Sequence, residues 1–404
     1  MLQMITCPVT GAKIENVADH PVLGYGFRPF FALAGLYAAA VIPLWVLIWL
    51  GRISFAPALA PVHWHAHEML FGFAAAALGG FLLTAVPNWT GQGPIRGRAL
   101  LILTATWIAG RVAMWMSGLL SPVLVAAIDL AFLPMLAAFQ APGIVARSAR
   151  RNGVFVVILL ALFGANLAIH LEAIGLADGA HWGIRLALGI LVLAVTLVGG
   201  RIVPAFTQGG LKAQGIPTAI APLPRLDLAA IASVALMVLT EAAHAPDMIV
   251  GGFAAAAALA ALARLLRWHG HRTLRWPLLW VLQLGMAWMV VGLSLKAAAL
   301  FDLLPEAMAL HALGAGAIGT MILAVMTRAT LGHTGRELVA VPGSAYAYLA
   351  VSTGALLRVL AAALPDAAVA LTIGGGLSWA AGFALFLWLY GGMLLHPRPD
   401  GRAG

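Results

Sequence analysis

The chain has 404 residues, of which 62% are hydrophobic and only 9% are charged, with a mean hydropathy of +0.98 and a formal net charge of +9. A soluble globular domain carries roughly a quarter charged residues, so this composition excludes a soluble domain, a disordered chain, a collagen and a disulfide scaffold. Most basic residues flank long apolar runs, which indicates membrane anchoring rather than a nucleic-acid-binding face. The single cysteine, Cys7, excludes an intramolecular disulfide and any zinc or iron–sulfur site built on cysteines.

Apolar segments long enough to cross a bilayer, which takes about 20 residues, occur along the whole chain. The twelve segments are 29–50, 62–86, 98–118, 121–140, 153–173, 182–203, 224–243, 246–268, 276–299, 306–328, 342–363 and 367–395. The connections between them are short, and the longest, 204–223, could separate two six-helix halves. We therefore expect an all-α polytopic membrane protein, a bundle of about 12 transmembrane helices at 29–395, with tails at 1–28 and 396–404.

Lysine and arginine predict the orientation, because they accumulate in cytoplasmic loops. Of the 23 such residues, 18 lie in the tails or near the connections that follow even-numbered spans. Only four belong to the other side, namely Arg52, Arg185, Lys296 and Arg358, and the remaining one, Arg111, lies inside a span. Together with the even number of spans, this bias predicts that both termini lie in the cytoplasm.

Three alternate histidines open the second span, in the sequence PVHWHAHE at residues 61–68. His63 and His67 are four residues apart and share one helix face, whereas His65 and Glu68 share a different face. Imidazole is the usual ligand for copper and haem iron, and a nearby carboxylate can orient such a ligand or relay a proton. One face would therefore bind a metal and the other a second centre or a supporting group. The alternative is a polar helix start at the level of the lipid headgroups.

Two further histidines lie at a depth comparable to that of His67 on the outer side. His170 ends the fifth span, with Asn166 one turn deeper on the same face, and His311 lies in the first turns of the tenth span. We therefore expect three helices to bring these histidines together. The small residues at 312–319 would allow close helix packing or leave a slot for a flat macrocycle. Ionisable residues inside a membrane are functional candidates by default.

Two charged residues face each other across the short turn between the third and fourth spans. Arg111 and Asp129 both lie roughly 10–12 Å below this turn, so we expect an intramembrane ion pair. The pair either locks the hairpin, or Arg111 binds a haem propionate and Asp129 carries protons. A second polar group, around Arg328, His333 and Arg336, lies toward the cytoplasmic side, and its role stays open.

Several long motifs resemble the NnrS family. They are GYGFRPFF at 24–31, WHAHEMLFG at 64–72, TAVPNWTG at 84–91, GRIVPAFT at 200–207, and the stretch from His311 to Arg336. The similarity runs from about residue 20 to residue 395. It implies a twelve-span protein of the bacterial cytoplasmic (inner) membrane that contains haem and copper and takes part in the response to nitric oxide.

The residues predict a histidine-rich membrane protein, and the resemblance alone implies nitric oxide; on that basis we expect a protein that binds nitric oxide and reduces it to nitrous oxide. The resemblance implies haem b and copper as cofactors, and a membrane quinol is the expected electron donor. The first alternative is a non-catalytic protein that handles nitric oxide or a metal, and the second is a transporter, since twelve spans are common among transporters.

The hypothesis gives individual residues expected roles. The expected metal ligands are His63, His65, His67, His170 and His311. The residues expected to bind the cofactor are His63, His67, His311 and Arg111. The residues expected to carry protons in catalysis are Glu68 and Asp129.

Overall fold

The computed structural model describes residues 5–6, 13–14, 20–145 and 152–401. Several residues considered above lie outside the described residues, namely Cys7, Arg147, Arg150, Arg151 and Arg402. Two short strands, β1 (Ile5–Thr6) and β2 (Lys13–Ile14), pair antiparallel near the N-terminus. The rest of the regular structure that is described consists of helices.

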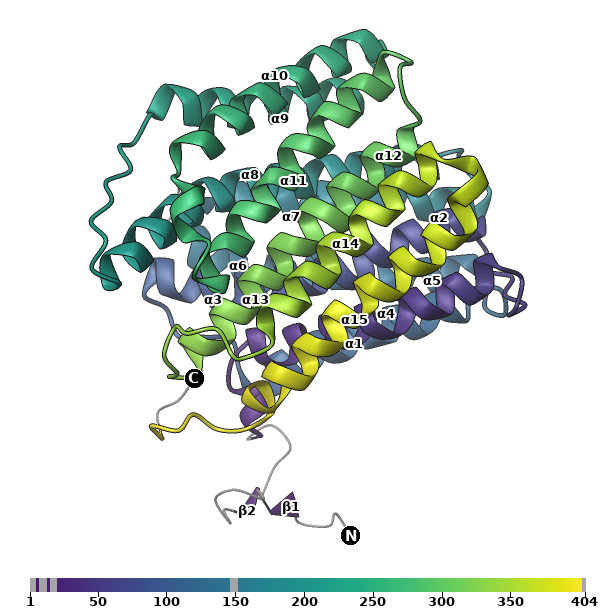
Figure 1. The fold of residues 1–404 in the computed structure, drawn as a ribbon. Coiled ribbons are helices and arrows are strands. Elements are labelled where there is room, and N and C mark those ends of the chain that lie inside the picture. The colour runs from purple at the N-terminus through teal and green to yellow at the C-terminus, as the bar shows by residue number, and fades with distance from the viewer. Residues whose placement is uncertain (1–4, 7–12, 15–19, 146–151, 402–404) are drawn as a thin grey trace.

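The helices follow one another with short connections (Figure 1). The first half of the chain contains η2 (Pro21–Leu23), α1 (Phe27–Trp49), α2 (Pro61–His67), η3 (Glu68–Ala74), α3 (Ala75–Thr90), α4 (Gly97–Trp115), α5 (Pro122–Asp129), α6 (Phe132–Val145), α7 (Val154–Ile174) and α8 (Ala180–Ala213). The second half contains α9 (Pro224–Ala242), α10 (Asp247–Arg267), η5 (Gly270–Thr273), α11 (Pro277–Leu300), α12 (Glu306–His311), η6 (Ala312–Ile318), α13 (Gly319–His333), α14 (Ser344–Ala363), η7 (Pro365–Ala367) and α15 (Ala368–Leu395).

Eleven helical rods within the described part of the chain are long and apolar enough to cross a membrane. This confirms the prediction of an all-α polytopic membrane protein. The predicted span at 224–243 forms α9, which is not among the eleven. Its 19 residues include Arg225, Asp227 and Glu241, so its composition alone does not mark it as a membrane span.

The acidic residues of α9 are paired with basic residues of the helices around it. Glu241 Oε1 lies 2.7 Å from Lys296 Nζ of α11 and 2.8 Å from Arg185 Nε of α8. Toward the other end of α9, Asp227 Oδ1 lies 3.0 Å from Arg264 Nε of α10. Figure 1 shows α9 beside α10 at one edge of the bundle. These pairs offset the cost of placing charges at this depth, so α9 packs along the bundle like the other rods.

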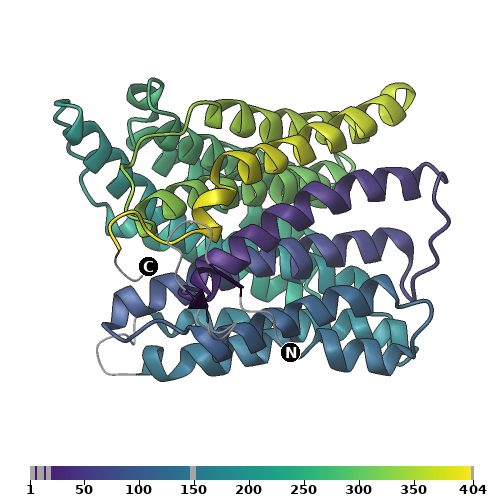
Figure 2. The same cartoon turned by 90° about the horizontal axis from the view of Figure 1, so that it is seen from below.

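The two ends of the helical region lie at the same end of the bundle. Arg28, in the first turn of α1, donates hydrogen bonds from Nη1 to the carbonyl oxygens of Leu394, at 3.0 Å, and of His396, at 2.7 Å. Figure 2 shows α1 running beside α15. Ends on one side require an even number of crossings, so α9 is the twelfth member of the predicted bundle.

Replacing Glu241 with leucine is expected to destabilise the protein by about 3 kcal/mol, because Lys296 and Arg185 then lack their buried carboxylate. The measurement is the midpoint of unfolding in detergent by circular dichroism. The double variant Glu241→Leu/Lys296→Met should recover part of the loss, and Thr240→Val, at a half-buried neighbouring position outside these ion pairs, serves as the control. A Glu241→Leu protein as stable as wild type would show that these pairs do not hold α9 in place.

Two rods at the centre of the bundle contain seven-residue π-helical segments. In the rod from Pro61 to Thr90 the segment is η3, which begins directly after His67, and in the rod from Glu306 to His333 it is η6, which begins directly after His311. A π-helical turn redirects the side chains around it and occurs frequently at functional sites. His67 and His311, which directly precede these segments, are therefore candidates for a functional site.

Candidate metal centre

A group of polar side chains lies buried where α2, η3, α4, α5 and α7 meet. We call it the His67 cluster, and its members are His67, Glu68, Arg111, Asp129, Asn166 and His170. Each member is at most 6% exposed. Ionisable groups at this depth are expensive unless they are paired, so their contacts decide what the cluster can do.

Asp129 contacts four of the other members. Its Oδ2 lies 3.0 Å from His170 Nε2 and 3.2 Å from His67 Nε2. The same oxygen accepts a hydrogen bond of 2.8 Å from Asn166 Nδ2. Its Oδ1 pairs with Arg111 Nη2, so the ion pair predicted between these two residues is present.

Glu68 connects the cluster to α1. Its Oε1 accepts a hydrogen bond of 2.8 Å from Arg111 Nη1 and lies 2.8 Å from His67 Nδ1. Its Oε2 accepts a hydrogen bond from the hydroxyl of Tyr37. The Tyr37 oxygen accepts one of 3.2 Å from Trp115 Nε1. A continuous set of hydrogen-bonding groups thus runs from Trp115 to the imidazole of His67.

Two glycines make room for these contacts. A Cβ at Gly72 would lie 2.7 Å from the Tyr37 ring and 3.0 Å from Arg111 Nη1. A Cβ at Gly110 would lie 3.0 Å from Asp129 Oδ1. The 2.7 Å distance at Gly72 is too short for a real Cβ, and the two distances of 3.0 Å would require the neighbouring side chains to shift, so glycine at these positions lets the tyrosine and the ion pair approach the cluster.

The imidazole of His67 faces oxygen atoms on both sides. Its Nδ1 faces Glu68, while its Nε2 faces Asp129 and lies 2.8 Å from Asn166 Oδ1. A neutral imidazole has one N–H donor, so it cannot satisfy both sides. A protonated imidazolium, a protonated Glu68 carboxyl that donates to Nδ1, or a metal cation bound at Nε2 would each satisfy the geometry.

The ligand atoms nearest to such a cation form a compact set. One atom each from His67, Asp129 and His170 lie within 4.8 Å of one another. Two imidazoles and a carboxylate suit copper, iron(II) and zinc. With neutral imidazoles, the carboxylates of Glu68 and Asp129 outnumber the guanidinium of Arg111 by one negative charge, which a cation would compensate. The residues present therefore fit a copper ion.

His63 lies one turn outward and does not join the cluster. Its Nδ1 lies 3.2 Å from Glu172 Oε1, and both side chains are partly exposed. Glu172 Oε2 in turn accepts a hydrogen bond of 2.7 Å from the backbone N–H of Ala180. The structure thus places His63 in a contact between α2, α7 and the start of α8.

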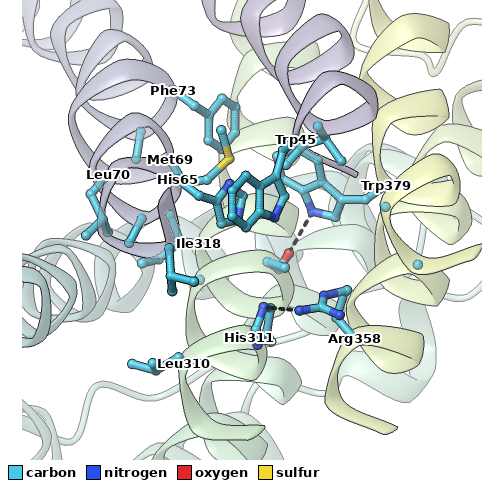
Figure 3. Close-up of a pocket in the computed structure, with 18 of the residues that line it drawn as sticks. Trp45, His65, Met69, Leu70, Phe73, Leu310, His311, Ile318, Arg358 and Trp379 are labelled. Carbon is cyan, nitrogen blue, oxygen red and sulfur yellow. Dashed lines mark hydrogen bonds between the residues drawn. The ribbon is translucent and has the colours of Figure 1, made fainter. Parts of the chain in front are cut away.

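His65 and His311 lie in a second site, a cavity of about 190 Å³ (Figure 3) that we call the His65 cavity. The ring of Trp45 stacks on His65 at a centroid distance of 4.5 Å. Nδ1 of His311 donates to the carbonyl oxygen of Ala307 at 2.7 Å, so Nε2 carries the lone pair and accepts a hydrogen bond of 3.0 Å from Arg358 Nη2. Nδ1 of His65 is buried and has no hydrogen-bond partner in the part of the chain that the structure describes.

The side chains that line the His65 cavity suit haem, but the volume of the cavity does not. It offers imidazoles, an arginine and aromatic walls that include Trp45 and Trp379. Its volume is below the range of about 300–1,000 Å³ that is usual for small-molecule pockets. A porphyrin therefore does not fit the cavity. Because His311 lines this cavity, it lies apart from His67 and His170, the histidines that it was expected to join.

The sequence contained a signal for several contacts that were not predicted. Three basic residues assigned to outer connections, Arg185, Lys296 and Arg358, fall within the limits of predicted spans and bind partners inside the protein. A charge inside a span is a functional or structural candidate by default, which would have identified them. Tyr37 and Trp45 carried no comparable signal, because aromatic residues are common in apolar helices.

The chain was compared with protein-family models and with curated proteins. The family model described as NnrS protein matches residues 21–398. No curated protein matches the chain. The matched region includes every member of the His67 cluster and of the His65 cavity.

Proposed function

The chain belongs to the NnrS family, as its motifs predict, and from this we propose that it is a copper-containing protein that reduces nitric oxide to nitrous oxide. Family membership supports the coarser statement that it is a membrane protein of the nitric oxide response. The observation that carries the finer proposal is the convergence of His67, Asp129 and His170 on one buried point. Haem, which the resemblance implies, is not assigned to particular residues.

The reaction joins two molecules of nitric oxide, with two electrons and two protons, to give nitrous oxide and water. A copper ion held by His67, Asp129 and His170 would supply one-electron redox chemistry. Nitric oxide is small and apolar, so it enters from the lipid and needs no polar channel. The protein's own contribution is a dry site with fixed charges around the reacting molecules.

Glu68 is the residue proposed to hold and deliver protons. Its Oε1 lies against the imidazole of His67 and its Oε2 against the hydroxyl of Tyr37, so it has a proton partner on both sides. Arg111 binds both Glu68 and Asp129, and its positive charge reduces the repulsion between the two carboxylates. Asp129 then acts as a metal ligand in this proposal, and Arg111 as a positioning residue.

We also infer that the protein lies in the bacterial cytoplasmic membrane with both termini in the cytoplasm. Of the four basic residues assigned to the outer side, Arg185, Lys296 and Arg358 pair inside the protein. Arg52, in the connection after α1, is then the exposed one on that side. With the three paired residues set aside, the excess of lysine and arginine on the predicted cytoplasmic side is larger, which supports the predicted orientation.

Purified protein, given isotopically labelled nitric oxide and a small water-soluble reductant without oxygen, is expected to form one nitrous oxide for every two nitric oxide molecules consumed. Mass spectrometry of the gas phase measures the ratio. Binding of about one nitric oxide per copper without nitrous oxide would contradict the proposal and favour the non-catalytic alternative. Absence of copper from the protein, with no binding of nitric oxide, would favour a transporter.

A further inference from the structure

A groove between α1 and α4 opens at the periphery of the helix bundle, beside the His67 cluster. Its volume is about 520 Å³, within the range that is usual for small-molecule sites. Its rim is apolar and exposed, and Leu36, Ile108 and Val112 are 56%, 42% and 52% exposed. A surface of this kind on a membrane-spanning helix faces lipid, so a molecule dissolved in the bilayer can reach the groove.

Polar groups line the apolar groove at one place. Tyr37 and Arg111 both line it, and both bind Glu68. Arg111 is 6% exposed, and its Nε has no hydrogen-bond partner among the described residues, although Nη1 and Nη2 are paired. Trp107 and Trp115 supply aromatic walls, and the ring of Trp107 meets Tyr37 edge-on at 5.6 Å. The Tyr37 hydroxyl donates to Glu68 and accepts from Trp115 Nε1, so its oxygen keeps one lone pair for a donor from outside the chain.

We propose that this groove binds the head group of a membrane quinol and is where the protein receives its electrons. The inference rests on the proposed reduction of nitric oxide. A quinol has an aromatic ring for the tryptophan walls, a hydroxyl that can donate a hydrogen bond to the Tyr37 oxygen, and an apolar tail that stays in lipid. The acyl chain of a phospholipid would fill the groove but offer no hydrogen-bond donor to Tyr37.

The chemistry of a quinol matches the needs of the reaction. One quinol and two nitric oxide molecules give one quinone, one nitrous oxide and one water. The quinol is oxidised by two electrons, nitric oxide is reduced, and the two O–H protons of the quinol become the hydrogens of water. These protons leave the head group beside Tyr37, whose hydroxyl already binds Glu68, so the path to the cluster is one residue long.

The test compares two isoleucines of α4. Ile108 lines the groove, whereas Ile102, 55% exposed on the same helix, does not. Purified wild type, Ile108→Trp and Ile102→Trp are labelled with a photoreactive ubiquinone analogue, with and without excess unlabelled ubiquinone, and the labelled peptides are mapped by mass spectrometry. Rates of nitric oxide loss are measured with a short-chain ubiquinol and, separately, with a small water-soluble reductant.

Labelling of α1 and α4 that unlabelled ubiquinone competes away, and that falls at least tenfold in Ile108→Trp but not in Ile102→Trp, would support the proposal. The ratio of the ubiquinol-driven to the reductant-driven rate should fall similarly in Ile108→Trp. Labelling elsewhere, or labelling that unlabelled ubiquinone does not compete away, would contradict quinol binding in the groove, even if the water-soluble reductant drives nitric oxide loss. Competed labelling in the groove without nitric oxide loss with either donor would support the groove and contradict the proposed function.

Discussion

Replacing His170 with alanine is expected to remove the bound copper and to lower nitric oxide reduction at least 100-fold. Loss of a supporting group near a metal already lowers affinity or activity about 10–100-fold, and His170 is one of three proposed ligands. Copper per chain is measured by elemental analysis of the purified protein. The matched control is His63→Ala, which removes a histidine one turn outward that contacts Glu172 instead of the cluster.

The control variant should keep both copper and activity. Loss of copper in His63→Ala together with its retention in His170→Ala would move the metal out of the cluster and toward the start of α2. Retention in both variants would show that these two histidines are not ligands.

Replacing Glu68 with glutamine is expected to leave copper in place and to lower the formation of nitrous oxide about 100-fold or more, the usual effect of losing a general acid or base. Glutamine keeps the size of the side chain but cannot carry the proton between Tyr37 and His67. The measurement combines copper content with the rate of nitrous oxide formation. Glu172→Gln, on a partly exposed carboxylate outside the cluster, is the control.

An active Glu68→Gln protein would contradict the proton-carrying role of Glu68. If the variant instead loses its copper, the carboxylate is needed to hold the cluster together, and its role is one of positioning. These outcomes separate proton transfer from structure because the substitution removes one charge without changing the volume.

The fold was largely predictable because hydropathy and length mark each rod that faces lipid. The segment at 224–243 is a partial exception. Its apolar residues predict a membrane-spanning helix, but its charged residues exclude it from a count of spans that is based on composition alone. Its place in the bundle depends on Lys296 and Arg264, which lie far away in the sequence. The π-helical segments η3 and η6 were not predicted. A change from i→i+4 to i→i+5 backbone hydrogen bonds within a helix leaves no mark in the pattern of apolar residues.

The candidate site was predictable in part. The spacing of four between His63 and His67 placed both on the side of the second rod that faces α7, and the structure shows contacts from that side to Glu172 and Asn166. His311 was expected nearby because its depth matches that of His67. Depth is readable from a sequence, but the rotation of a helix about its axis depends on packing, and His311 faces α14 instead.

The central claim is that His67, Asp129 and His170 hold copper in the interior of the bundle. X-ray absorption at the copper edge of the purified protein tests it most directly, on wild type and on His67→Ala. The account predicts scattering from two imidazoles and an oxygen ligand in wild type, and its loss or change in the variant. A spectrum dominated by sulfur, or one that His67→Ala leaves unaltered, would contradict it.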